Sequence, residues 1–166
     1  MKKMLLLILS TILLFSFSVA FAADLKVGVL DVQKTLQSIP QVEKMQAQLK
    51  KRFTPQQAQI TKLQNQLKAD FDKFNREHDV MKDKDKKAMQ KTILANQEKL
   101  HNLQMNFQQQ LMEAQKKAMQ SILNDIENVV DGIAADQKLN IVLTKANVAY
   151  NDSDMDITDQ VIKALK

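Results

Sequence analysis

The sequence predicts a mainly helical protein with a small β body, in which a long helical hairpin is inserted between β segments at the two chain ends. The first supporting observation is the placement of glycine and proline, of which the chain has two each. None of them lies between Pro55 and Gly132, and this interval is rich in good helix formers. The second is that strand-like patterns occur only near the two ends of the chain.

Three segments have the pattern of short β-strands. Residues 25–29 (LKVGV) alternate as a half-buried strand does, and residues 140–144 (NIVLT) are a short run rich in β-branched residues. Residues 148–151 (VAYN) are a third candidate. Segments so far apart can pair only if the intervening chain folds back. We therefore predict a body made of residues 23–40 and 138–166, with residues 41–137 forming a hairpin arm.

The first helix of the arm has one apolar stripe, because its large apolar residues recur in steps of three and four. Thr54 and Pro55 interrupt the stripe. Thr54 is suited to cap a second helical segment and Pro55 to begin it, so we predict a kink there. The apolar pattern lapses at residues 78–87 (HDVMKDKDKK), where we place the tip. The stripe comprises Val42, Met45, Leu49, Phe53, Ile60, Leu63, Leu67, Phe71 and Phe74.

The returning helix has a longer stripe, from Leu100 to Ile133, which covers 33 residues in nine steps of about 3.67. This spacing matches an eleven-residue repeat and predicts straight or slightly right-handed arms. A helix from near Lys84 to Asp136 would be about 80 Å long, so it must project from the body. A second line of apolar residues runs beside the stripe and comprises Met105, Met112 and Met119.

The chain is predicted to end in a short helix after a turn-rich loop. Asp156 is placed to cap this helix, with Asp159 three positions later. Val161, Ile162 and Leu165 give the helix an apolar side.

Residues 1–22 have the features of a secretory signal sequence. Lys2 and Lys3 precede an apolar segment, and residues 20–22 (AFA) form a small-x-small cleavage pattern, which predicts cleavage after Ala22. A retained membrane anchor is the alternative, although the apolar segment is short for a span. Cleavage would leave 144 residues and lower the formal net charge from +5 to +3. The absence of cysteine excludes disulfides and a lipoprotein anchor.

We expect no enzyme activity, no cofactor and no metal site. His78 and His101 are 23 positions apart, whereas a metal-binding pair on a helix needs a spacing of three or four. Phosphate-binding loops and nucleophile motifs are absent from the sequence. Nucleic acid is excluded as a partner because the basic residues alternate with acidic ones and lack an aromatic platform.

The two ends of the predicted mature chain carry a family resemblance. Residues 23–32 (ADLKVGVLDV), 140–151 (NIVLTKANVAYN) and 156–166 (DITDQVIKALK) resemble corresponding segments of the Skp (OmpH-like) periplasmic chaperones, in the family's order. The arms match only in length and pattern. The resemblance implies a homotrimer shaped like a jellyfish, which holds unfolded outer-membrane proteins in the periplasm without ATP. An exported coiled-coil scaffold of the cell envelope is the alternative function.

The resemblance also suggests where binding residues lie. The strands of three subunits would form the trimer interface. Some apolar and basic residues of the arms would contact the client protein, whereas Met112 is better explained by packing between the arm helices. Lys116 and Lys117 are candidates for lipopolysaccharide or an anionic membrane surface, although Glu113 and Ala114 stand where the family's arginine pair is expected. The interface candidates are Val27, Val29, Ile141, Leu143, Val148 and Tyr150, and the client-contact candidates are Phe71, Phe74, Met105, Phe107, Met119, Lys91 and Lys99.

Overall fold

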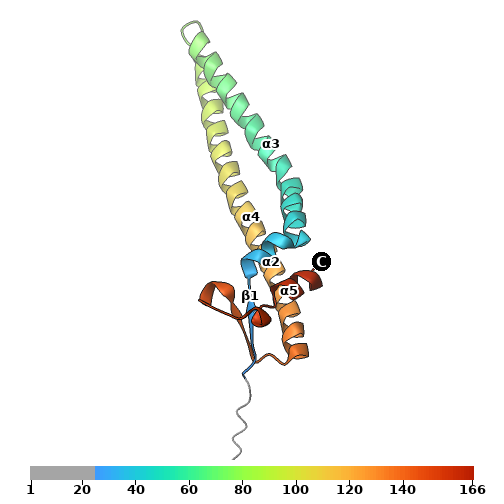
Figure 1. Cartoon of the computed structure of the whole chain (residues 1–166). Coiled ribbons are helices and arrows are strands. Elements are labelled where there is room, and N and C mark those ends of the chain that lie inside the picture. The colour runs from blue at the N-terminus through green and yellow to red at the C-terminus, as the bar shows by residue number, and fades with distance from the viewer. Residues whose placement is uncertain (1–24) are drawn as a thin grey trace, which may run out of the picture.

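The computed structural model describes residues 25–166 as a small body from which a long two-helix arm projects (Figure 1). This confirms the predicted fold class, a mainly helical chain with a small sheet and a long helical hairpin. The predicted signal sequence and its cleavage site lie outside the described residues. The elements in chain order are β1 (Val27–Leu30), α2 (Val32–Ser38), α3 (Pro40–Glu77), α4 (Asp83–Gln137), β2 (Ile141–Thr144), the 3-10 turns η1 (Lys145–Asn147) and η2 (Ser153–Met155), and α5 (Thr158–Ala164).

The sheet joins the two ends of the chain. β1 and β2 are parallel, with Val27 opposite Ile141 and Leu30 opposite Thr144. The hairpin makes this pairing possible, since α3 leads away from the body and α4 returns to it. Gly28 allows close packing at this point, because a Cβ atom there would lie 2.9 Å from the Leu139 Cδ1 atom.

The predicted third strand at residues 148–151 is wrong. This segment follows the η1 turn and pairs with no strand. Local side-chain hydrogen bonds favour a turn here, since the Asn147 amide donates to the Thr144 hydroxyl and the Asn151 amide donates to the Asp152 carbonyl. The second edge of β1 is instead occupied near Asp156, where the Ile157 N–H donates to the Val29 carbonyl at 2.9 Å.

The body has its own hydrophobic core, formed where α5, α2 and the C-terminal part of α4 meet β1. Two buried threonines hydrogen-bond to Asp31 within it, and the bond to Thr158 connects the two chain ends. The Asp31 N–H donates to the Thr158 hydroxyl at 2.9 Å, and the Thr35 hydroxyl donates to the Asp31 carbonyl at 2.8 Å. The core residues are Leu30, Ile39, Ile122, Ile126, Ile157, Val161 and Leu165. A single chain can therefore bury a core in the body without a partner.

The start of α5 differs in detail from the prediction. Ile157 is the residue directly before the helix, and the Asp156 carboxylate accepts from the Thr158 N–H at 2.9 Å. Hydrogen bonding to Thr158, with Lys145 nearby, lowers the pKa of Asp156 below its usual value. Asp159 does not contribute to the cap, since its carboxylate pairs with the Lys34 ammonium at 2.8 Å.

The turn of the arm is shorter than the predicted tip. α3 ends at Glu77 and α4 begins at Asp83, so the turn occupies residues 78–82. The charged residues 84–87 lie in the first turns of α4. Asp83 and Asp85 suit that position, because carboxylates interact favourably with the positive end of a helix dipole.

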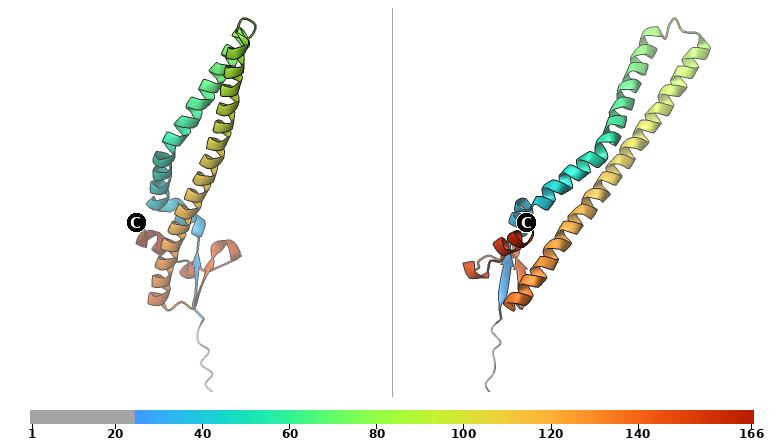
Figure 2. Two further views of the ribbon diagram at one scale, coloured as in Figure 1. Left: turned by 180° about the vertical axis from the view of Figure 1, so that it is seen from behind. Right: turned by 90° about the vertical axis from the view of Figure 1, so that its right-hand side faces the viewer.

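Pro55 does not divide α3 into two helices. The helix is continuous from Pro40 to Glu77, and the Thr54 hydroxyl donates to the Lys50 carbonyl at 2.6 Å instead of capping a new segment. The predicted cap at Thr54 is therefore wrong. A proline within a helix removes one hydrogen bond and crowds the preceding turn. Accordingly, α3 changes direction in its teal stretch (Figure 2, right).

Gly132 offers a test of helix stability in the body. It lies within α4, and no atom outside its own helix is within 4 Å of the position that a Cβ would occupy. We expect Gly132→Ala to stabilise the protein by about 0.5–1 kcal/mol, because alanine loses less backbone entropy in a helix. Urea unfolding measures this change. Gly28→Ala is the matched control and should destabilise, because its Cβ would meet Leu139.

Candidate binding surfaces

The seam between α3 and α4 uses much of the apolar stripe. Four α3 residues are buried against α4, and Ile93 of α4 is buried against α3. Phe107 of α4 contacts Phe53 edge to face, with ring centroids 5.8 Å apart and planes at 87°. Phe107, predicted to contact a client, is therefore half-buried in the seam. The buried α3 residues are Phe53, Ile60, Leu63 and Leu67.

The other apolar candidates differ in their exposure. Met105 is 55% exposed and Phe71 is 37% exposed. Phe74 and Met119 are half-buried, and the Phe74 ring lies 5.2 Å from the His78 ring. Phe71 and Met105 are thus the most exposed of the predicted apolar contact residues.

Three exposed apolar residues of the arm were not among the predicted contacts. Met112 and Leu94 on α4 are each 65% exposed, and Val80 in the turn is 85% exposed. The expectation that Met112 packs between the arm helices is therefore wrong. Met112 is one heptad from Met105, which was already a client-contact candidate. This spacing was the signal that could have identified Met112 as exposed.

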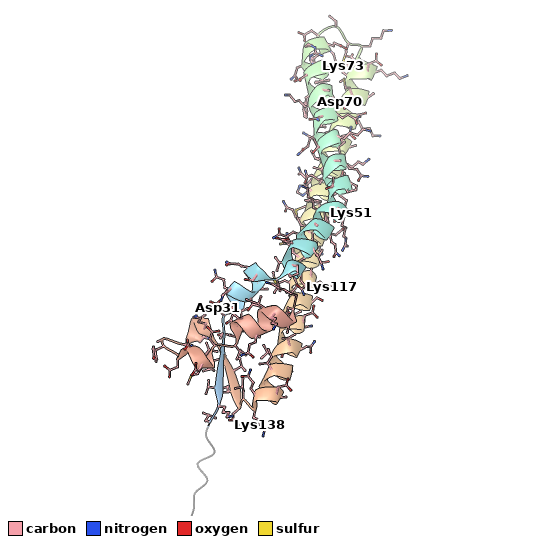
Figure 3. The ribbon with its side chains drawn as sticks, turned by 45° about the vertical axis from the view of Figure 1, so that its right-hand side comes forward. Asp31, Lys51, Asp70, Lys73, Lys117 and Lys138 are labelled. Carbon is pink, nitrogen blue, oxygen red and sulfur yellow. The ribbon has the colours of Figure 1, made fainter. Side chains whose placement is uncertain are left out.

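The basic candidates lie on the solvent side of α4. Lys91, Lys99, Lys116 and Lys117 are all exposed, and no carboxylate in residues 25–166 lies within 4.0 Å of their ammonium groups. Side chains project from both arm helices into solvent, as Lys117 on α4 illustrates (Figure 3). Lys116 and Lys117 border a shallow groove that also includes Glu113. The arm therefore presents positive charges that are free to attract an acidic partner.

The predicted interface residues gather around the sheet but are unequally available. Ile141 is 44% exposed and Leu143 is 39% exposed, and within the described chain β2 pairs only with β1. Val27 and Val148 are half-buried. Val29, in contrast, is 1% exposed, so it contributes to the core of its own chain and has no surface to offer a partner.

Tyr150, the remaining interface candidate, lies on the loop between β2 and α5 and is 80% exposed. Its hydroxyl donates to the Asp152 carboxylate at 2.7 Å. This hydrogen bond raises the pKa of Tyr150 above its usual value. The ring is thus an exposed, amphipathic side chain on this loop.

Comparison with known proteins identifies the family. The model of the outer membrane protein (OmpH-like) family matches residues 26–165. This chain belongs to the OmpH-like family. It is 30% identical to chaperone protein Skp of Pectobacterium atrosepticum over 145 residues, which are 87% of each chain. It is 26% identical to chaperone protein Skp of Photorhabdus luminescens over 166 residues, the full length of both chains.

A solved structure supports the OmpH-like fold. The crystal structure of an OmpH-like protein from Caulobacter crescentus CB15 matches with a TM-score of 0.75 and covers 84% of this chain and 83% of that chain. Its sequence is only 18% identical, so the likeness concerns the fold alone.

Other kinds of site find no support in the described part of this OmpH-like chain. Residues 25–166 contain no cluster of His, Asp and Glu side chains that could hold a metal ion, and none of their helices is both long and apolar enough to cross a membrane. The concavities along the arm are open grooves, such as the one bounded by Leu49, Phe53 and Phe107. Such a surface is suited to contacting an extended chain over many places.

Proposed function

We propose that this protein is an ATP-independent holding chaperone of the periplasm, which binds unfolded outer-membrane β-barrel proteins and keeps them soluble before membrane assembly. The observation that carries the proposal is the arm, a projecting two-helix rod with exposed apolar side chains among unpaired lysines. Membership in the OmpH-like family and similarity to proteins named chaperone protein Skp over 87% to 100% of the chain support it.

Binding would rest on many weak contacts. Lys91 and Lys99 would increase the rate of encounter with an acidic client. Retention would depend on apolar contacts with residues such as Phe71 and Met105. A client that remains unfolded would lose conformational entropy in any single pose, so no one contact can dominate. Lys116 and Lys117 could in addition contact an anionic surface such as lipopolysaccharide, but Glu113 in the same groove weakens that attraction.

The working form would be a homotrimer. A free strand edge is prone to pair with another chain, and β2 presents such an edge with Ile141 and Leu143 exposed beside it. Joining three bodies through these edges would cover the apolar residues. It would also direct three arms to one side, around a shared space for the client. Export through a signal sequence cleaved after Ala22 would place the assembly in the periplasm.

The alternative function is a coiled-coil scaffold of the cell envelope. A scaffold would use its apolar stripe for self-packing or for one defined partner. The large exposure of Leu94, Met105 and Met112 outside the seam favours the chaperone, because a scaffold has no need of unburied apolar side chains on a solvated helix.

The proposal is tested by diluting a urea-unfolded β-barrel protein into buffer with stoichiometric amounts of the mature protein and no nucleotide. We expect light scattering to stay low and the client to co-elute with the chaperone in gel filtration. The same β-barrel protein, already folded in detergent, is the control and should not bind. Unchanged aggregation would reject the chaperone function in favour of the scaffold.

A further inference from the structure

Three exposed apolar side chains form a single line along the solvent side of α4. Leu94 and Met112 are eighteen residues apart, which is five turns at 3.6 residues per turn, so both point in the same direction from the helix axis. Met105 departs from that direction by only about 20°. Leu94 and Met112 are each 65% exposed, and Met105 is 55% exposed. We call Leu94, Met105 and Met112 the outer apolar line.

Two members of this line carry thioether sulfurs that solvent can reach. The chain contains no cysteine, so no thiol competes for oxidants. Among the methionines of residues 25–166, Met105 and Met112 have the most exposed side chains. Met155 in the body follows at 39%. The remaining methionines of this range are half-buried: Met45, Met81, Met89 and Met119.

Oxidation of these two sulfurs is compatible with an intact arm. Neither side chain belongs to the buried seam, which is formed by residues such as Phe53, Leu63 and Ile93. Met45 differs, since it packs against the core of the body. A sulfoxide at Met105 or Met112 would therefore change the surface of the arm and leave the packing of α3 against α4 in place.

We propose that Met105 and Met112 form a reversible oxidation site that lowers the affinity of the arm for apolar clients. This proposal rests on the proposed chaperone function. Hydrogen peroxide would deliver one oxygen atom to each thioether. The sulfur lone pair attacks one peroxide oxygen and forms the new S–O bond, the O–O bond breaks, and the departing hydroxide takes up the proton of the transferred oxygen and leaves as water. The product is a polar, chiral sulfoxide, which sulfoxide reductases convert back to methionine.

The physical effect follows from the loss of two of the three apolar contacts of the line. Methionine suits a surface that must accept many sequences, because its side chain is flexible and polarisable. A sulfoxide oxygen requires hydrogen bonds and would lose those to water wherever a client covers it. The oxidised arm would keep its lysines, so encounter with an acidic client would continue while retention weakens.

The first test maps the modification itself. The folded, full-length mature protein is treated with limiting hydrogen peroxide and digested, and added oxygen atoms are located by mass spectrometry. We expect Met105 and Met112 to be oxidised before Met45, Met89 and Met119. Equal rates at all methionines, or faster reaction at the half-buried ones, would overturn the assignment of this site.

The second test measures client holding before and after oxidation within each variant. Met105→Leu with Met112→Leu removes both sulfurs and keeps apolar side chains. Met119→Leu is the matched control, because it is one heptad from Met112 but half-buried. We expect oxidation to weaken holding by roughly three- to tenfold in the wild type and the control, since two apolar contacts are lost, and to have a clearly smaller effect in the double variant. Sulfoxide reductase should restore the wild type.

The outcomes separate this proposal from the chaperone function. Equal losses on oxidation in the double variant and in the control would refute the role of these two residues. If the unoxidised wild type holds no client, the proposed chaperone function is rejected, and so is the proposed effect of oxidation on client affinity. The mass-spectrometric map would still decide whether Met105 and Met112 are the oxidation site.

Discussion

Replacing Ile141 with aspartate is expected to dissociate the proposed homotrimer into monomers. Ile141 lies on β2 beside the unpaired edge of the sheet and is 44% exposed in the single chain. In the trimer an aspartate at this position would be a buried, unpaired charge, which costs several kcal/mol, and the cost recurs in each of three copies. Native mass spectrometry at micromolar concentration should show three chains for the wild type and one for the variant.

The matched control for this prediction is Leu94→Asp. Leu94 is also an exposed apolar residue, at 65%, but it lies on the arm, away from the sheet. This variant should keep the wild-type mass. Circular dichroism checks that Ile141→Asp still folds, as we expect because the body retains its own core. A folded Ile141→Asp protein that stays trimeric, or a monomeric wild type, would contradict the proposed assembly.

Replacing Phe53 with alanine is expected to destabilise the arm more than other single changes there. Phe53 is 4% exposed, it contacts the Phe107 ring, and the Arg52 guanidinium lies 5.1 Å from its centroid. Truncating a buried phenylalanine typically costs about 3–5 kcal/mol. The arm has only two helices and no other layer to compensate. Hydrogen exchange should show loss of protection in α3 and α4 of the arm, whereas β1 and α5 should remain protected.

Phe71→Ala is the control for Phe53, since it removes the same ring from a position that is 37% exposed. It should change hydrogen exchange little, and its effect on client holding should be small because holding is distributed over many contacts. Equal loss of protection in both variants would mean that the seam does not stabilise the arm as its burial indicates.

The sequence predicted the elements with long, regular patterns. The arm helices follow from about forty to fifty positions of good helix formers with a stripe in steps of three and four, and the structure shows α3 and α4 with 38 and 55 residues. The strands at residues 27–30 and 141–144 followed from alternation and β-branching. These signals are repeated many times or are intrinsic to the residues, so they do not depend on the neighbours in the fold.

Predictions that depended on a single local choice were less successful. The third strand failed because Asn147 and Asn151 form hydrogen bonds with nearby residues, which a strand pattern does not reveal. The cap at Thr54 failed because packing against α4 holds α3 together across Pro55. In both cases competing interactions of about 1 kcal/mol decide the outcome.

By itself, the sequence determined the two long helices of the arm, the strands that became β1 and β2, and that the arm must be a hairpin projecting from a body. It did not locate α2, and it suggested a third strand that does not form. Only the tertiary structure decided which side of each element is covered. Alternation placed Val29 and Leu143 on strands, but in the fold the first is 1% exposed and pairs with the segment at Asp156, whereas the second is 39% exposed. The wide stripe of α4 can be only partly covered by one partner helix. The rotation of α4 against α3 therefore buries Ile93 and leaves Leu94 and Met112 in solvent.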